Sequence, residues 1–270
     1  MAKFKDALDD SSAALAAMSP MIEQQRQWNP YSSQGGTAAA LAGDDFVVVA
    51  SDTRLTGPNE IEILSRNCEK THILTNKIIM NNCGFYGDVL QLKRLLMLRI
   101  DHYEFVYQHA MSLEQCSEML ARMLYSRRSF PYYTGAILCG IDSDGRGSIY
   151  GYDPVGCVER VPFNASGNGG KIVQTFFENQ WTFSTVSPEE RKKMPKPTLE
   201  RALSVMRDAF RGLSERETTT GDSVKLYWTK AGDDQATFFC APANLPLAWR
   251  LTPRCRCDCC FCWHFDEVLK

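Results

Sequence analysis

The sequence predicts an α+β protein: a four-layer αββα sandwich of two antiparallel sheets flanked by helix pairs. Two observations carry this prediction. Strand patterns occur in groups separated by pairs of helix patterns, which argues against a repeating βαβ unit and a parallel sheet. Each group also has an apolar face, and two facing sheets with helices on both outer sides would bury all of these faces.

The composition is that of a folded protein with no polyanionic partner. Of the 270 residues, 44% are hydrophobic, and the formal net charge is −2. These values exclude a disordered chain and give no basis for nucleic-acid binding. The longest apolar runs, such as Phe46 to Ala50, fall far short of the ~20 residues that span a bilayer. Acidic residues near the N-terminus stand where a secretion signal would be basic or apolar, so we expect an intracellular protein.

Three parts are expected along the chain. Residues 1–35 are polar and irregular, with breakers at Pro20 and Pro30, and are interpreted as an N-terminal extension or pro-segment. Residues 36–241 carry regular patterns and are interpreted as the domain. Residues 242–270 are interpreted as a Cys-rich C-terminal extension.

The predicted domain opens with a strand pair. Thr37 to Ala42 and Phe46 to Ser51 are joined by the turn-forming trio Gly43-Asp44-Asp45. The first segment is ambiguous because alanine favours helix, and its shortness and the preceding Gly35-Gly36 pair decide for a strand. Further short strand candidates follow at Ile61 to Leu64, His72 to Leu74 and Lys77 to Asn81.

Two helices are predicted next. Apolar residues recur at mostly three- and four-residue intervals from Val89 to Tyr103, which is typical of one buried helix face. The second helix opens at Ser112, where Gln115 three residues on completes a capping box. It runs to Arg127-Arg128, whose positive charges suit a helix C-terminus.

The second half repeats this order of strands, two helices and strands. Asp142 to Gly145 is interpreted as a hairpin turn, although its spacing faintly resembles a calcium loop that lacks the downstream glutamate. Ser187 to Pro197, rich in proline and charge, is expected to be a surface loop between the helices. The predicted strands are Thr134 to Ile141, Ser148 to Tyr152, Val158 to Phe163, Ser223 to Lys230 and Ala236 to Cys240, and the predicted helices are Lys171 to Gln180 and Leu199 to Leu213.

Several short motifs together resemble one family. They are Asn29-Pro30-Tyr31 before Gly35-Gly36-Thr37, Ala50-Ser51-Asp52-Thr53-Arg54-Leu55, Leu124-Tyr125-Ser126-Arg127-Arg128 with Phe130-Pro131-Tyr132-Tyr133, Tyr152-Asp153-Pro154-Val155-Gly156, and Thr220-Gly221-Asp222. This set resembles the β subunits of the proteasome core, which belong to the N-terminal nucleophile hydrolases. The match runs from about Pro30 to Cys240. The resemblance implies the same αββα sandwich that the element order predicts.

The resemblance also implies where a nucleophile would stand. Active members use an N-terminal threonine whose own amine is the base, with a lysine and an aspartate nearby. In the family, 16 residues separate the threonine from this aspartate, and counting back 16 from Asp52 reaches Gly36 rather than Thr37. Because neighbouring strand residues point to opposite faces, the Thr37 hydroxyl is expected to turn away from the pocket. Lys70 matches the family lysine.

Other positions matched to the family also differ from those of active members, which agrees with a site that has no catalytic activity, here called the silent site. Asn168 stands where active members carry a serine, Glu217 where they carry an aspartate, and Thr220 where they carry a second serine. Asp52, Arg54 and Lys70 are therefore interpreted as a buried ion-pair remnant that fixes strand geometry. Gly35-Gly36 is interpreted as a flexible lead into the first strand.

Eleven cysteines raise the question of a metal. Five of them crowd the end of the chain at Cys255, Cys257, Cys259, Cys260 and Cys262, followed by His264. Their alternate spacing does not fit a structural zinc site, so an exposed tail without metal is expected, with a zinc or copper(I) cluster as the alternative. The scattered Cys68, Cys83, Cys116, Cys139, Cys157 and Cys240 are expected to be small buried side chains. His72, His102 and His109 are expected to be ordinary core or surface residues.

The expected function is therefore structural. The resemblance implies a non-catalytic β-ring subunit of the 20S proteasome, with no catalytic, cofactor or metal residues. The implied partners are two β neighbours, the adjacent α ring and the opposite β ring, with no nucleic acid and no membrane. The alternatives are an active threonine endopeptidase subunit that uses Thr37 and a metal-handling protein that uses the cysteine tail. In inactive members the pro-segment is commonly trimmed upstream, which implies cleavage before Pro30.

Overall fold

The computed structural model describes residues 31–191, 193–194, 197–233 and 236–242. The expected N-terminal extension up to residue 30 lies outside the described residues, as does the tail from residue 243 with its five cysteines. The description below concerns the folded unit that begins at Ser33.

Two five-stranded sheets form the centre of the fold, and every strand pair in them is antiparallel. The first sheet has the order β10-β1-β2-β11-β12 and the second has the order β5-β6-β7-β8-β9. A separate hairpin pairs β3 with β4. The strands are β1 Thr37–Ala42, β2 Phe46–Asp52, β3 Leu55–Thr56, β4 Ile63–Ser65, β5 Thr71–Thr75, β6 Ile78–Gly84, β7 Thr134–Ile141, β8 Gly147–Tyr152, β9 Val158–Val161, β10 Phe163–Gly167, β11 Ser223–Lys230 and β12 Thr237–Pro242.

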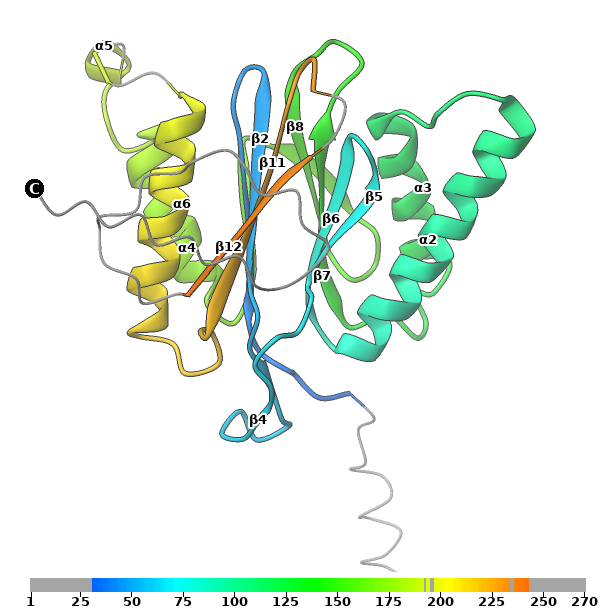
Figure 1. Cartoon of the computed structure of the whole chain (residues 1–270), viewed down its shortest axis with the longest axis horizontal. Helices are drawn as coiled ribbons and strands as arrows, with labels where there is room; N and C mark the ends of the chain where they lie inside the picture. The colour runs from blue at the N-terminus through cyan, green and yellow to red at the C-terminus, as the bar shows by residue number, and fades with distance from the viewer. Residues whose placement is uncertain (1–30, 192, 195–196, 234–235, 243–270) are drawn as a thin grey trace, which may run out of the picture. The chain divides into compact units, whose positions relative to one another are not determined.

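A helix pair covers the outer face of each sheet (Figure 1). Helices α2 and α3 lie against the second sheet, and α4 and α6 lie against the first. The helices are α2 Tyr86–Tyr107, α3 Leu113–Tyr125, α4 Gly170–Phe177 with the π-helical turn Glu178–Thr182, the short α5 Pro188–Arg191, and α6 Leu199–Ser214. The predicted four-layer sandwich is confirmed.

Three apolar layers fill the spaces between the four structural layers. One contains Phe177 and Phe210 beneath α4 and α6, and another contains Leu92 and Leu120 beneath α2 and α3. The middle layer lies between the sheets and is built from smaller side chains: Ala38, Ala40, Val47, Val49, Ile79, Cys83, Ile137, Cys139 and Ile149, together with Tyr227. Successive side chains of a strand point to opposite faces of its sheet. One set of residues therefore packs against the helices and the other against the facing sheet.

A buried polar group, the side chain of Asn81, interrupts the apolar middle layer and connects the two sheets. The buried amide of Asn81 on β6 donates to the backbone oxygens of Ala39 at 3.3 Å and Ala50 at 2.8 Å, both in the other sheet. Its own side-chain oxygen accepts from the Thr71 hydroxyl at 3.1 Å, which also bonds the Ser51 hydroxyl at 2.8 Å. Since a buried polar group costs free energy unless it is paired, these bonds favour one alignment of the sheets.

Most predicted elements are present with small differences at their ends. The capping box of α3 is confirmed, because the Ser112 side chain accepts from Gln115 N–H and the Gln115 side chain accepts from Ser112 N–H. The Asp142 to Gly145 turn is confirmed as a hairpin turn. No described helix combines the length and apolar character that crossing a membrane requires.

Three sequence predictions need correction. The predicted strand Val158 to Phe163 is two strands in different sheets, because Pro162 separates β9 from β10 and lacks the N–H that a continuous ladder needs. The predicted loop from Ser187 contains the short helix α5. Of the scattered cysteines, Cys157 and Cys240 are exposed rather than buried.

His72 is a buried histidine on β5. Its side chain is 3% exposed, and neither ring nitrogen has a hydrogen-bond partner among the described residues. Burial lowers the pKa of His72 to about 4, helped by Lys93 and Lys225 and opposed by Glu69. The fold therefore holds this ring in its neutral form.

We expect the free energy of unfolding to fall by about 3 kcal/mol between pH 6.5 and pH 4 because of His72. The folded-state pKa lies below the ordinary value of 6.5, so the stability is fully present above that pH and is lost as pH falls. Urea denaturation at several pH values would measure a smaller loss in His72→Leu than in the unmodified chain. The exposed His109 supplies the control, His109→Gln. Equal pH dependence in His72→Leu and the unmodified chain would contradict the prediction.

Candidate functional site

The predicted site residues meet at one end of the sandwich, where β1 begins and β2 ends. Asp52, the last residue of β2, is fully buried there, and Lys70 precedes β5. Lys70 Nζ lies 2.7 Å from Asp52 Oδ1 and donates at 2.6 Å to the backbone oxygen of Arg54. The structure thus brings together the Asp52 and Lys70 that the sequence singled out.

The Asp52 carboxylate also collects backbone N–H groups from three segments. Thr37 N–H donates to Oδ1 at 2.8 Å, while Arg54 N–H and Gly221 N–H donate to Oδ2 at 3.2 Å and 3.4 Å. Burial raises the pKa of Asp52 above its ordinary value, and Lys70, Thr37 and Gly221 act against that rise. The carboxylate therefore depends on these partners for its charge, because an unpaired buried anion is very costly.

Gly36 stands directly in front of Lys70. A Cβ built on Gly36 would overlap Lys70 Nζ and would lie 2.9 Å from Asp52 Oδ1. The backbone of Gly36 has φ +81°, in the left-handed region that favours glycine. The position that faces the lysine therefore carries no side chain and has no room for one.

The Thr37 hydroxyl lies elsewhere and is completely buried. Its oxygen accepts from Gly169 N–H at 3.2 Å and shares a 2.8 Å hydrogen bond with the Thr220 hydroxyl. No basic side chain is among these partners, and no surface is left for an incoming carbonyl. Chemically, this hydroxyl is a satisfied core group.

The remaining matched residues make hydrogen bonds to their neighbours around the same end of the sheet. Asn168 donates through its amide to Glu60 Oε1 at 3.0 Å and to the Thr219 hydroxyl at 3.2 Å. Glu217 Oε1 accepts from the Thr219 hydroxyl at 3.0 Å. Thr220 contacts Thr37 as described above. These groups form a loop-to-loop network rather than a proton path to a nucleophile.

Arg54 belongs to a second ion cluster beside the first. Its Nε lies 2.9 Å from Asp222 Oδ2, and Arg66 Nη1 lies 2.6 Å from Asp222 Oδ1. Burial alone would raise the pKa of Asp222, but the two guanidinium groups outweigh it and hold the pKa below its ordinary value. The sequence interpretation grouped Arg54 with Asp52 and Lys70, whereas the structure pairs its side chain with Asp222.

Sequence reasoning missed several contributors to this end of the fold. Gln34 and Gly35 were placed in the extension, yet they contact the domain directly. Arg66 and Thr219 were not singled out. Nothing in their local sequence distinguishes them, because their partners are distant in the chain.

Cys83 is the other nucleophilic group nearby. It borders a hollow of about 240 Å³ with Ser33, Gly35, Thr134 and Asn168. Burial raises the pKa of the Cys83 thiol to about 12, so it is not a thiolate near neutral pH. Within the described part of the chain, no three metal-ligating side chains gather into a cluster.

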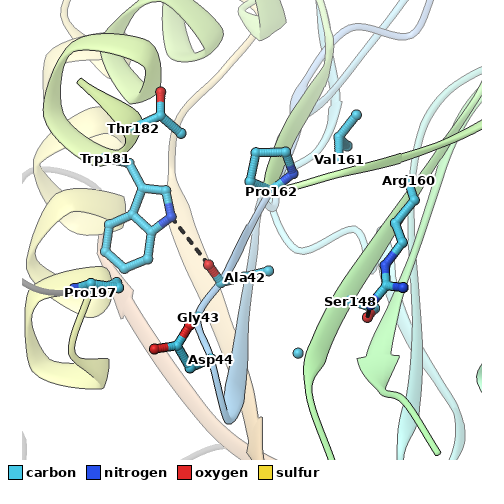
Figure 2. Close-up of a pocket in the computed structure, with 11 residues that line it drawn as sticks. Ala42, Gly43, Asp44, Ser148, Arg160, Val161, Pro162, Trp181, Thr182 and Pro197 are labelled. Carbon is cyan, nitrogen blue, oxygen red and sulfur yellow. Dashed lines mark hydrogen bonds between the residues drawn. The ribbon is translucent and has the colours of Figure 1, made fainter. Parts of the chain in front are cut away.

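A larger hollow of about 470 Å³ opens at the other end of β1, around the β1–β2 turn. Figure 2 shows Trp181 at one side of it, with the indole Nε1 donating to the backbone oxygen of Ala42 at 3.2 Å. Arg160 borders the opposite side and binds Asp142 at 3.0 Å and the Ser148 hydroxyl at 2.6 Å. The Arg160 guanidinium is therefore bonded within the fold.

Comparison with known proteins points to one family. The family model described as "Proteasome subunit" matches residues 32–229. Proteasome subunit beta type-1 of Caenorhabditis elegans is 47% identical over 232 residues, which cover 86% of this chain and 89% of that protein. Proteasome subunit beta type-1 of Drosophila melanogaster is 39% identical over 199 residues, 74% of this chain and 83% of that protein. Proteasome subunit beta type-6 of Saccharomyces cerevisiae is 32% identical over 208 residues, 75% of this chain and 86% of that protein.

Lys70→Met is expected to lower the free energy of unfolding by about 3–5 kcal/mol, because it leaves Asp52 buried without its counter-ion. Denaturant titration of the purified chain measures this loss. The matched control is Lys230→Met, since Lys230 pairs with Asp45 at 3.4 Å and both side chains are about half exposed. That variant is expected to lose at most about 1 kcal/mol. Equal losses in the two variants would contradict the prediction.

Proposed function

The chain belongs to the proteasome subunit family, and we propose that it is a non-catalytic structural subunit of the β ring of the 20S core particle. The family model covers residues 32–229, and relatives named proteasome subunit beta type-1 match most of the chain. Family membership implies assembly with other proteasome subunits. The proposed role is to support assembly and to wall the chamber in which proteins marked by ubiquitin are degraded.

The observation that carries this proposal is the register of the chain at Gly36. A threonine hydrolase needs a hydroxyl beside the lysine and a free amine to act as the base. Here the residue in front of Lys70 is glycine, and the lysine fills the space that a side chain would need. The Asp52–Lys70 ion pair therefore stabilises the fold, and no nucleophile stands beside it to be activated.

The position of Thr37 also supports the proposal. Its hydroxyl is buried between Gly169 and Thr220, and its N–H is bound by Asp52. The alternative, an active endopeptidase that uses Thr37, would require β1 to move by one residue. Such a shift would turn every side chain of the strand to the wrong face.

The proposed partners are two β neighbours, the adjacent α ring and the opposite β ring, with this chain at the sixth ring position. Large apolar side chains on the outside of the fold support extensive protein contacts. They include Leu90, Leu98, Phe105, Val106 and Tyr107 on α2, Tyr125 at the end of α3, and Phe130 and Tyr133 in the segment after it. The proposed location is the cytoplasm and the nucleus, where such particles would work.

Thr37→Ala in the assembled particle is expected to leave every peptidase activity unchanged once the amount of particle is matched. The physical reason is that the hydroxyl is a buried structural group, whose loss costs stability of about 1 kcal/mol rather than chemistry. Peptidase assays with substrates for each activity provide the measurement. Thr229→Ala removes another fully buried threonine, on β11, and controls for assembly defects.

Selective loss of one activity in Thr37→Ala, but not in Thr229→Ala, would overturn the structural role. Mass spectrometry of the subunit within the particle gives a second readout. We expect an N-terminus upstream of Gly36. An N-terminus at Thr37 that also reacts with a threonine-directed epoxyketone would establish the alternative.

Gly36→Thr is expected to destabilise the chain rather than create a nucleophile. The left-handed backbone costs about 1–2 kcal/mol for a side chain, and the overlap with Lys70 adds about 1–3 kcal/mol. Denaturant titration and epoxyketone labelling measure the two effects. Gly212→Thr is the matched control, because nothing lies within 4 Å of a Cβ added there. Labelling of Gly36→Thr at wild-type stability would refute this prediction.

A further inference from the structure

The segment Ser33–Gly36 lies beside the silent site and is bonded to it at both of its ends. In Figure 1 it is the blue chain that leads into β1. Ser33 Oγ is 3.5 Å from Asn168 Oδ1, and the backbone oxygen of Gly36 accepts from Asn168 N–H at 3.1 Å. We refer to residues 33–36 as the strap.

Gln34 is the main anchor of the strap. Its backbone oxygen accepts from Thr56 N–H at 3.0 Å on strand β3. Its side-chain oxygen accepts from Tyr86 N–H at 2.6 Å, at the first residue of α2. One residue thus joins the small hairpin to a helix whose start is 52 residues away.

The bond to Tyr86 fills a gap in the helix. The first N–H groups of a helix lack partners within it and are usually satisfied by the side chain of the preceding residue. In α2 that residue is Phe85, which makes no side-chain capping bond. Gln34 therefore supplies from a distance the cap that the local sequence lacks.

The two glycines of the strap fit where no other residue would. Gly35 has φ +67°, and a Cβ there would lie 2.6 Å from Thr219 Cβ and 2.7 Å from Thr56 Oγ1. Gly36 is equally enclosed by Lys70 and Asp52. The pair was expected to be a flexible lead into β1, but both residues are buried and closely packed.

We propose that the strap is a permanent internal ligand of the silent site: it caps α2 through Gln34 and occupies the space in front of Lys70. Proteolytic removal of the upstream extension then stops before Ser33, because the bonded backbone of the strap is not free to enter a protease active site. Further trimming would uncap the helix and open the buried ion pair. The strap thereby sets the limit of processing. This inference rests on the contacts of the full chain and holds whatever the peptidase activity of the particle.

The experiment compares backbone amide exchange in the full-length chain and its Gln34 variants by mass spectrometry. Gln34→Ala removes the acceptor, and we expect exchange at Tyr86 and the first turn of α2 to rise about fivefold, the effect of one lost hydrogen bond. Gln34→Glu keeps an oxygen acceptor near the helix start and is expected to retain wild-type protection. Gln91→Ala, the same change at an exposed position on the same helix, is the matched control.

Unchanged exchange in Gln34→Ala, or an equal rise in Gln91→Ala, would overturn the capping role. A second measurement needs no variant. Digestion of the wild-type full-length chain with proteinase K is expected to leave a resistant core that begins upstream of Ser33. A folded core that begins at Thr37 with unchanged thermal stability would disprove the strap.

Discussion

The buried charge of Asp52 is the constraint on which this end of the fold depends. A carboxylate removed from water must be matched by donors, and here they come from the start of β1, the segment after β2, Lys70 and the loop at Gly221. Each donor belongs to a different part of the chain. Satisfying one anion therefore brings four segments into register, which gives the Asp52–Lys70 pair a purpose that requires no catalysis.

Most helices and strands could be predicted because the residues that define each one lie close together in the sequence. Alternation in Thr134–Ile141 and Ser223–Lys230 defines β7 and β11 to the residue, and Ser112 with Gln115 defines the start of α3. The division of β9 from β10 was missed. Pro162 marks the break, which the sequence prediction passed over, and contacts distant in the chain decide which sheet each half joins.

The charged residues of the site and the register of Thr37 could be predicted, but the residues that hold them in place could not. Asp52, Lys70 and the one-residue offset of Thr37 could be found because the family resemblance supplies the positions and the spacing to count. Gln34 could not, because a glutamine in a polar segment has no local mark of a helix cap whose partner is 52 residues away. Arg54 was assigned to the wrong neighbour, since the sequence places it beside Asp52 while its guanidinium reaches Asp222.

The hydrogen bonds of Asn81 between the two sheets affect how the subunit would respond to a mechanical force. The middle layer that they cross is made largely of small residues, and Ala38, Ala40 and Asn81 are completely buried, so the two sheets lie close together and are pinned to each other. Such a body resists both sliding and compression. A displacement applied to the α2–α3 face would pass to the α4–α6 face rather than being absorbed between them. The sandwich would behave as a stiff spacer, a mechanical role that needs no catalytic group.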